Sequence, residues 1–261
     1  MLLSLFAVVV LIATIVGSIS GIGGGVLIKP VMDAIFPMTT SEISFLSGTT
    51  VLTMTVVSLL RSRKELKLDL RTFTLALGGA CGGVLGKQVF DIVKKAAGND
   101  AMVGLVQNII MVLLTLSVFI YTMKKAKIAT KNFKSPVFSL AIGLLLGILS
   151  SFLGIGGGPI NIMVLSYFFS LDTKSSAMAS LFVIFFSQVF SLFTSLITNT
   201  VPSFDWKMLI LMMVSAVIGS TMGRMFSKKM DNKAVDKLFM ALMAVIIALS
   251  IYNCFKFGMA L

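Results

Sequence analysis

The feature that most constrains this chain is a glycine-rich interruption that occurs twice in otherwise almost continuous apolar sequence. The pentapeptide Gly-Ile-Gly-Gly-Gly stands at residues 21–25 and again at 154–158, which are 133 residues apart. A serine precedes each copy at the same distance, Ser18 in the first and Ser151 in the second. Interrupted hydrophobic segments at matching positions of two halves are typical of the helices that form the binding sites of membrane transporters.

The composition supports a membrane location. The chain has 261 residues, of which 57% are hydrophobic and 12% charged, and its mean hydropathy is +1.03. Soluble domains carry roughly 25% charged residues. In lipid every backbone amide must be paired internally, and the ten-residue alternation of a membrane β-barrel is absent from the sequence. The chain is therefore predicted to be an all-α polytopic membrane protein in contact with the lipid bilayer.

The charged and reactive residues exclude several functions. The net charge of +12 comes from Lys and Arg in short runs between hydrophobic segments, where they set orientation, so we expect no nucleic-acid partner. Histidine is absent, which removes the commonest general base and metal ligand. Cys81 and Cys254 lie far apart in apolar runs and form neither a disulfide framework nor a zinc site. We expect no enzyme activity, no cofactor and no metal.

Hydrophobic blocks near the length of a membrane span divide the chain. Two of them are oversized and contain the pentapeptide, and each is predicted to form a first helix followed by a half-helix of about 12 residues, which rises about 18 Å. The blocks are residues 2–36, 43–60, 72–90, 102–123, 136–169, 176–197, 207–226 and 238–258.

The duplication extends over the whole chain and predicts two halves, residues 1–134 and 135–261. Each half would hold one broken helix pair with its half-helix and three transmembrane helices. The motif Gly-x-x-x-Gly followed by a cation begins at Gly82 and again at Gly219, and small residues at this spacing favour close helix contacts. We also match residues 47–50 with residues 178–181, behind the two half-helices.

The distribution of positive charge predicts how the halves are oriented. If each broken block turns back to the side from which it entered, sixteen Lys and Arg residues lie on the cytoplasmic side and five on the outer side, with Lys29 left out of the count. If the second broken block crosses the membrane once, the division is only 12 to 9. The first arrangement makes the halves inverted repeats in a prokaryotic plasma or inner membrane.

The glycine breaks predict an anion site. Each break frees backbone N–H groups and starts a half-helix whose N-terminus acts as roughly +0.5 charge, so two converging N-termini favour a small anion. Glycine also lets an ion approach the backbone amides. The alternative is that the glycines only permit tight helix crossing. The candidate binding residues are Gly21, Gly23, Gly24 and Gly25 in the first break and Gly154, Gly156, Gly157 and Gly158 in the second.

Four polar side chains are further candidates for this site. Lys29 lies one turn into the first half-helix, and its alternatives are an ion pair with Asp33 four residues on or an ammonium that reaches the interface. Thr49 and Ser180 could donate hydroxyls, although such residues often bond a carbonyl one turn back. Asn161 stands at the start of the second half-helix, where an amide could reach the site or cap the helix.

These motifs resemble those of the TauE/SafE family of sulfite exporters. The resemblance rests on the paired Ser-x-x-Gly-Ile-Gly-Gly-Gly segments, on Ser47-Gly48-Thr49-Thr50 and on the segment from Ala179 to Phe186, and it covers essentially the whole chain. It implies a multi-pass transporter for sulfur-containing oxyanions such as sulfite, organosulfonates or thiosulfate. Two departures concern the substrate: Ser-Gly-Thr stands where Ala-Thr-Ser is frequent, and Lys29 has Ile162 as its counterpart.

The leading hypothesis is a secondary transporter that binds a small sulfur-containing oxyanion at the membrane midplane and exposes it to each side in turn. The first alternative is an anion channel with the same glycine-lined filter. The second is a membrane sulfur-relay enzyme that acts through Cys81, against which the absence of histidine argues. The sequence leaves the exact anion, the direction, the coupling ion and the oligomeric state open.

Overall fold

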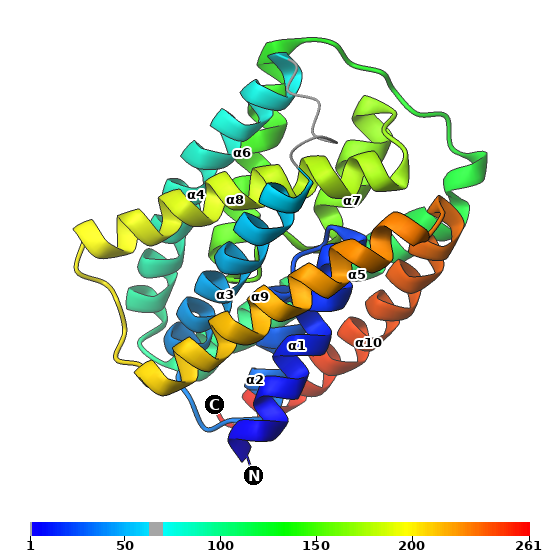
Figure 1. The fold of residues 1–261 in the computed structure, drawn as a ribbon. Coiled ribbons are helices and arrows are strands. Elements are labelled where there is room, and N and C mark those ends of the chain that lie inside the picture. The colour runs from blue at the N-terminus through cyan, green and yellow to red at the C-terminus, as the bar shows by residue number, and fades with distance from the viewer. Residues whose placement is uncertain (1, 63–69) are drawn as a thin grey trace.

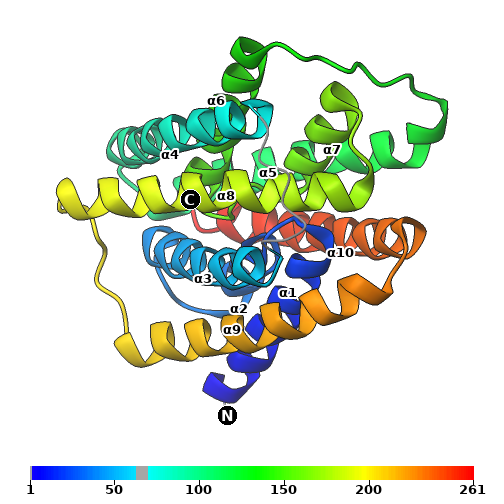
Figure 2. The same cartoon turned by 45° about the horizontal axis from the view of Figure 1, so that its top comes forward.

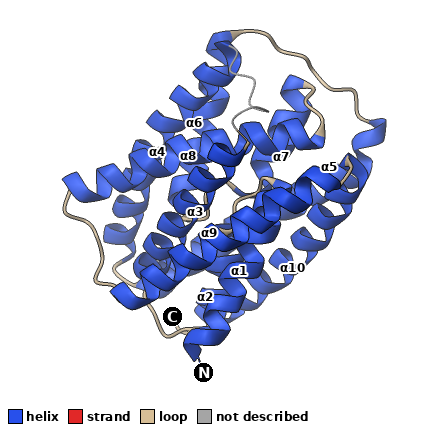
Figure 3. Cartoon of the chain, viewed as in Figure 1, coloured by secondary structure: helices blue, strands red, loops and turns tan. Residues whose placement is uncertain are grey.

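The computed structural model describes residues 2–62 and 70–261, and in these ranges every regular element is a helix (Figures 1 and 3). The first half contains α1 (Leu2–Ser20), α2 (Gly25–Ile35), α3 (Thr40–Arg61), α4 (Leu70–Ala97) and α5 (Asp100–Lys124), followed by the short turn η1 (Lys125–Lys127). The second half contains α6 (Pro136–Leu153), α7 (Gly158–Phe169), α8 (Thr173–Ile197), α9 (Trp206–Lys229) and α10 (Asn232–Gly258).

Both oversized blocks are broken at the pentapeptide, as predicted, and the half-helices α2 and α7 have 11 and 12 residues. Each broken block turns back on itself. The rings of Phe6 and Phe36 lie 4.9 Å apart and join the start of α1 to the end of α2. The rings of Phe138 and Phe169 lie 6.4 Å apart and join the start of α6 to the end of α7. Neither block carries the chain across the molecule.

Six helices in the described part of the chain are long and apolar enough to cross a membrane: α3, α5, α6, α8, α9 and α10. Two shorter apolar helices, Phe6–Ser20 within α1 and α7, accompany them. The predicted span 72–90 forms the long helix α4, but its glycines and charged residues make it less hydrophobic than the six. The all-helical, multi-pass prediction is confirmed.

The small-residue motifs lie where helices of the two halves touch. A Cβ atom at Gly82 on α4 would overlap the carbonyl oxygen of Leu144 on α6. A Cβ atom at Gly219 on α9 would lie 2.7 Å from the carbonyl oxygen of Leu11 on α1. Glycine at these positions lets the backbones approach, as small residues do between membrane helices. The predicted close contacts are confirmed, and they pair α4 with α6 and α9 with α1.

Equivalent contacts recur 133 positions apart. Ser18 and Ser58 are hydrogen-bonded through their hydroxyls at 3.1 Å, and Ser151 donates its hydroxyl to Ser191 at 2.7 Å. A Cβ atom at Gly21 would overlap Ala177, and one at Gly154 would lie 2.7 Å from the Cβ of Ser44. This offset pairs residue 47 with residue 180. The match of residues 47–50 with 178–181 was therefore wrong by two positions, because it was made from residue types without contacts.

The connection from α5 to α6, which carries the second basic run, lies at the end of the molecule opposite the two termini (Figure 1). Figure 2 shows α8 running across the middle of the bundle, where it contacts both α3 and α10. Most of the basic run between Arg61 and Arg71 lies outside the described residues.

Candidate binding cavity

The two glycine breaks meet in the interior. A Cβ atom at Gly23 would lie 3.5 Å from the carbonyl oxygens of both Ile155 and Gly156, and one at Gly25 would lie 2.6 Å from the carbonyl oxygen of Ile155. Ile22 and Ile155 are 2% and 1% exposed. The N-terminal ends of α2 and α7 therefore adjoin each other deep in the molecule, with apolar side chains packed around them.

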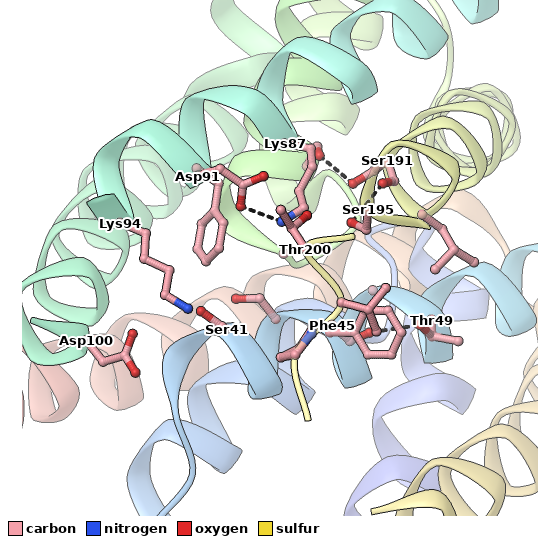
Figure 4. Close-up of a pocket in the computed structure, with 18 of the residues that line it drawn as sticks. Ser41, Phe45, Thr49, Lys87, Asp91, Lys94, Asp100, Ser191, Ser195 and Thr200 are labelled. Atoms are coloured by element: carbon pink, nitrogen blue, oxygen red, sulfur yellow. Dashed lines mark hydrogen bonds and ion pairs between the residues drawn. The ribbon is translucent and has the colours of Figure 1, made fainter. Parts of the chain in front are cut away.

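A cavity of about 630 Å³ leads from one end of the molecule to the second break (Figure 4). Its walls are the N-terminal half of α3, the C-terminal half of α4 and the C-terminal half of α8, and it reaches the junction of α6 with the break. The lining includes Ser41, Ser44, Phe45, Gly48, Thr49, Lys87, Asp91, Lys94, Lys95, Asp100, Ser151, Gly154, Gln188, Ser191, Ser195 and Thr200.

The charged side chains of the cavity are contributed by α4 and by the first residue of α5. Lys87, Lys94 and Lys95 outnumber Asp91 and Asp100, so the wall is net positive. The Lys87 ammonium lies 2.6 Å from the Asp91 carboxylate, and the Lys87 side chain is 12% exposed. Figure 4 shows this pair beside Ser191 and Ser195 of α8. A net positive wall with low-dielectric surroundings raises the local concentration of anions.

Hydroxyl groups line the deeper part. Ser151 donates to Ser191 near the floor. Gln188 donates its amide to Ser150 at 3.2 Å. The hydroxyls of Ser41 and Ser44 are buried and have no hydrogen-bond partner within the structure. Buried polar groups normally find partners, so free donors beside a cationic wall indicate a place where an oxyanion can bind.

Gly154 forms the floor of the cavity. It caps α6 in the left-handed region at φ 63°, a conformation that glycine adopts without strain. Below it, Val51 and Ile184 pack against Gly156, and both side chains are 0% exposed. The cavity thus ends at the second glycine break.

Of the twelve predicted site residues, Thr49 and Gly154 line this cavity. The Thr49 hydroxyl donates to the carbonyl of Phe45 at 2.9 Å, the local bond weighed above as its alternative. The remaining glycines lie in the packed interior. Gly21, Gly23, Gly24 and Gly25 belong to the first break, and Gly156, Gly157 and Gly158 belong to the second, with all seven side-chain positions buried.

Ser180 and Asn161 lie at the breaks in different ways. Ser180 donates its hydroxyl to the carbonyl of Gly21 at 2.7 Å, so it binds α8 to the first break. Asn161 is 0% exposed, and neither its amide nitrogen nor its amide oxygen has a hydrogen-bond partner within the structure. Its amide adjoins Gly157, at the N-terminal end of α7. An unpartnered buried amide beside a helix N-terminus could donate to an anion that reaches the break.

Lys29 forms the ion pair with Asp33. The two charged atoms are 3.2 Å apart, and the side chains are 3% and 0% exposed. Asn108 on α5 donates its amide to the same carboxylate at 3.3 Å. Lys256 on α10 donates to the carbonyl of Asp33 at 2.7 Å. The pair and its neighbours connect α2 with α5 and α10, away from the cavity.

Three residues of the cavity are not among the candidates predicted from the sequence: Lys87, Gln188 and Ser191. One signal was available, because Lys87 directly follows the second glycine of the small-residue motif and is therefore fixed at a helix contact. Gln188 and Ser191 carry no sequence signal of their own. They join the site because α8 crosses α3 and α4 at this point.

Comparison with known proteins agrees with this architecture. A family model described as "Sulfite exporter TauE/SafE" matches residues 5–250. The chain is 23% identical over 267 aligned residues to a protein of Bacillus subtilis (strain 168) described as "Probable membrane transporter protein YunE", and the alignment covers 93% of this chain and 95% of the relative. No solved structure matches the chain.

Proposed function

Because this chain belongs to the sulfite exporter TauE/SafE family, we propose that it is a secondary transporter for a small sulfur-containing oxyanion of the sulfite, organosulfonate or thiosulfate type. The family makes it a multi-pass transporter of the cell membrane and not an enzyme. The observation that carries the substrate class is the cavity with a net positive wall and free hydroxyls that ends on a glycine break. An oxyanion needs this combination of charge and short-range donors.

Each part of the cavity has a role in the proposed transport. The lysines of α4 attract the anion at the mouth, and the serine hydroxyls replace the water that it loses as it moves toward Gly154. Beyond Gly154, the adjoining N-termini of α2 and α7 supply positive dipole ends, and the Asn161 amide supplies a donor. The anion is bound there, near the midplane, when the cavity closes behind it.

Alternating access follows from the proposed relation between residues 1–134 and 135–261 as inverted repeats. The recurrence of contacts at an offset of 133 supports this relation. The turning back of both broken blocks supports it too, since each half then contains an odd number of crossings. Rocking of one helix group against the other would close the present cavity and open its counterpart.

The rival function is an anion channel. A channel has a path open to both sides, whereas here Val51 and Ile184 are packed beneath the cavity floor. This packing favours a carrier. Purified protein in proteoliposomes decides between them, because a carrier shows saturable counterflow of labelled sulfite, thiosulfate or sulfoacetate without conductance. Conductance in planar bilayers without counterflow would establish the channel, and neither signal with any of these anions would contradict the proposed substrate class.

In the same assay, Lys87→Gln is expected to raise the half-saturating concentration of the transported anion roughly tenfold, because it removes a charge-assisted donor from the wall. Lys207→Gln is the matched control, since Lys207 is an exposed cation on α9 outside the cavity lining. An unchanged half-saturating concentration for Lys87→Gln would remove this lysine from the site.

Orientation is tested with single cysteines in a variant that lacks Cys81 and Cys254. Val201→Cys stands at the mouth of the cavity and is expected to react with a membrane-impermeant thiol reagent from the outer face only. Met230→Cys, at the end of α9, is expected to react from the cytoplasmic face only. Reaction of both positions from one side would contradict the inverted arrangement.

A further inference from the structure

We propose that Arg224 is the anion-binding cation of a second cavity, on the opposite side of the membrane from the first, that is closed in this structure. The inference rests on the proposed carrier function and extends it, because it names the residues that receive the oxyanion after the first cavity closes. Arg224 is one of three charged side chains in the described residues that are almost completely buried, at 4% exposed.

Arg224 occupies the position in the second half that Lys87 occupies in the first. A Cβ atom at Gly86 would overlap the carbonyl oxygen of Ile148 and lie 2.9 Å from the Cβ of Ser151. One at Gly223 would overlap the carbonyl oxygen of Ile15 and lie 2.9 Å from the Cβ of Ser18. Lys87 directly follows Gly86 and Arg224 directly follows Gly223, so the two cations lie in equivalent surroundings.

The hydroxyls of the first cavity have counterparts around Arg224. Ser151 and Ser191, which line the first cavity, correspond to the hydrogen-bonded Ser18 and Ser58. Ser195, which also lines it, corresponds to Ser62, whose hydroxyl is buried and has no hydrogen-bond partner within the structure. These three hydroxyls therefore exist twice, once beside the open cavity and once buried.

The two sets differ in exposure. Ser18 and Ser58 are 0% exposed and Ser62 is 1% exposed, whereas their counterparts Ser151 and Ser195 are 8% and 5% exposed, and Ser191 and Lys87 are partly exposed to the cavity. A buried arginine within a membrane protein is costly unless it has a function or polar neighbours. Opening of this side would expose the guanidinium, whose planar donors match the oxygen atoms of an oxyanion better than an ammonium does.

The residues that follow the two cations differ. Lys87 is paired with Asp91 four residues on, and the position that corresponds to Asp91 holds Lys228. The two cavities would therefore differ in the charge that stands one helical turn after the anion-binding cation.

The test uses charged thiol reagents and needs no knowledge of the substrate. Ser58→Cys and Ser191→Cys are each made in the variant without native cysteines. Each is treated from either face with two methanethiosulfonate reagents, one that carries an anionic sulfonate group and one that carries a cationic trimethylammonium group. Ser58→Cys is expected to react from the cytoplasmic face only. The ratio of its reaction rate with the anionic reagent to that with the cationic reagent should be roughly tenfold higher than the same ratio for a small free thiol.

Substitution then separates charge from folding. Arg224→Gln is expected to abolish the tenfold preference for the anionic reagent, Arg224→Lys to retain it, and the exposed Lys229→Gln to leave it unchanged. Thr49→Trp fills the first cavity and blocks its closure. Because the second cavity opens only when the first one closes, the reaction of Ser58→Cys should become at least roughly tenfold slower.

Two results would overturn the inference while leaving the carrier function intact: transport with no reaction of Ser58→Cys, or a reaction whose reagent preference is unaffected by Arg224→Gln. The converse result, the expected labelling pattern with no flux of any sulfur oxyanion, would support the second cavity and contradict the proposed substrate.

Discussion

Lys29→Met is expected to lower the free energy of unfolding by about 3–5 kcal/mol, because it leaves the Asp33 carboxylate buried without its cation. The carboxylate is 0% exposed, and the only other donor that the structure gives its oxygens is the neutral amide of Asn108. The loss should appear as a lower yield of monodisperse protein in detergent and a lower midpoint of thermal unfolding. A midpoint equal to that of the unmodified protein would show that the pair contributes nothing to stability.

The double variant Lys29→Met with Asp33→Leu separates a structural role of Lys29 from a role in binding. Removal of both charges eliminates the stranded carboxylate, so stability should recover. If Lys29 acts only through Asp33, the recovered protein transports its anion with unmodified affinity. Because the ammonium is directed at Asp33 and not at the cavity, we expect this result. A stable double variant with affinity reduced roughly tenfold or more would instead place Lys29 in the anion site.

Gly157→Ala is expected to reduce transport below about one tenth while the protein still inserts. Gly157 has φ 113°, a backbone conformation that residues other than glycine rarely adopt, and its new Cβ would overlap the amide of Asn161. The equivalent glycine of the first half is the matched control. Gly24 has φ −62°, and the atoms nearest to its new Cβ would be a methyl group of Thr14 at 3.0 Å and the carbonyl oxygen of Ala13 at 3.3 Å.

Gly24→Ala should therefore retain most of the flux. The flux of both variants is measured as counterflow of labelled anion per milligram of inserted protein, under the same conditions. Equal flux in the two would mean that the break at Gly157 serves helix packing alone.

The helices could be predicted closely from the sequence because membrane spans are read from long apolar runs. The predicted block 207–226 became α9 at Trp206–Lys229, and both glycine breaks fell at the pentapeptides. At the start of α3, the Thr39 hydroxyl accepts the backbone N–H of Glu42 at 3.2 Å, a cap that the Ser/Thr-x-x-Glu spacing of these two residues favours. These features depend on neighbours in sequence, and local propensity determines them.

The cavity could not be predicted in the same way. Its lining joins α3, α4 and α8, so it depends on crossing angles that no local pattern encodes. The sequence pointed to the glycines themselves as ligands, whereas most of them lie in the packed interior, and Gly154 alone reaches the cavity floor.

The glycine contacts between α4 and α6 bear on how the protein is assembled during synthesis. Gly78, Gly82 and Gly86 leave a groove along α4 that α6 fills, and α6 follows the whole first half in the chain. Until α6 is synthesised, the groove lacks the helix backbone that fills it in the structure. A ribosomal pause or chain break before residue 136 would therefore leave α4 without its partner helix.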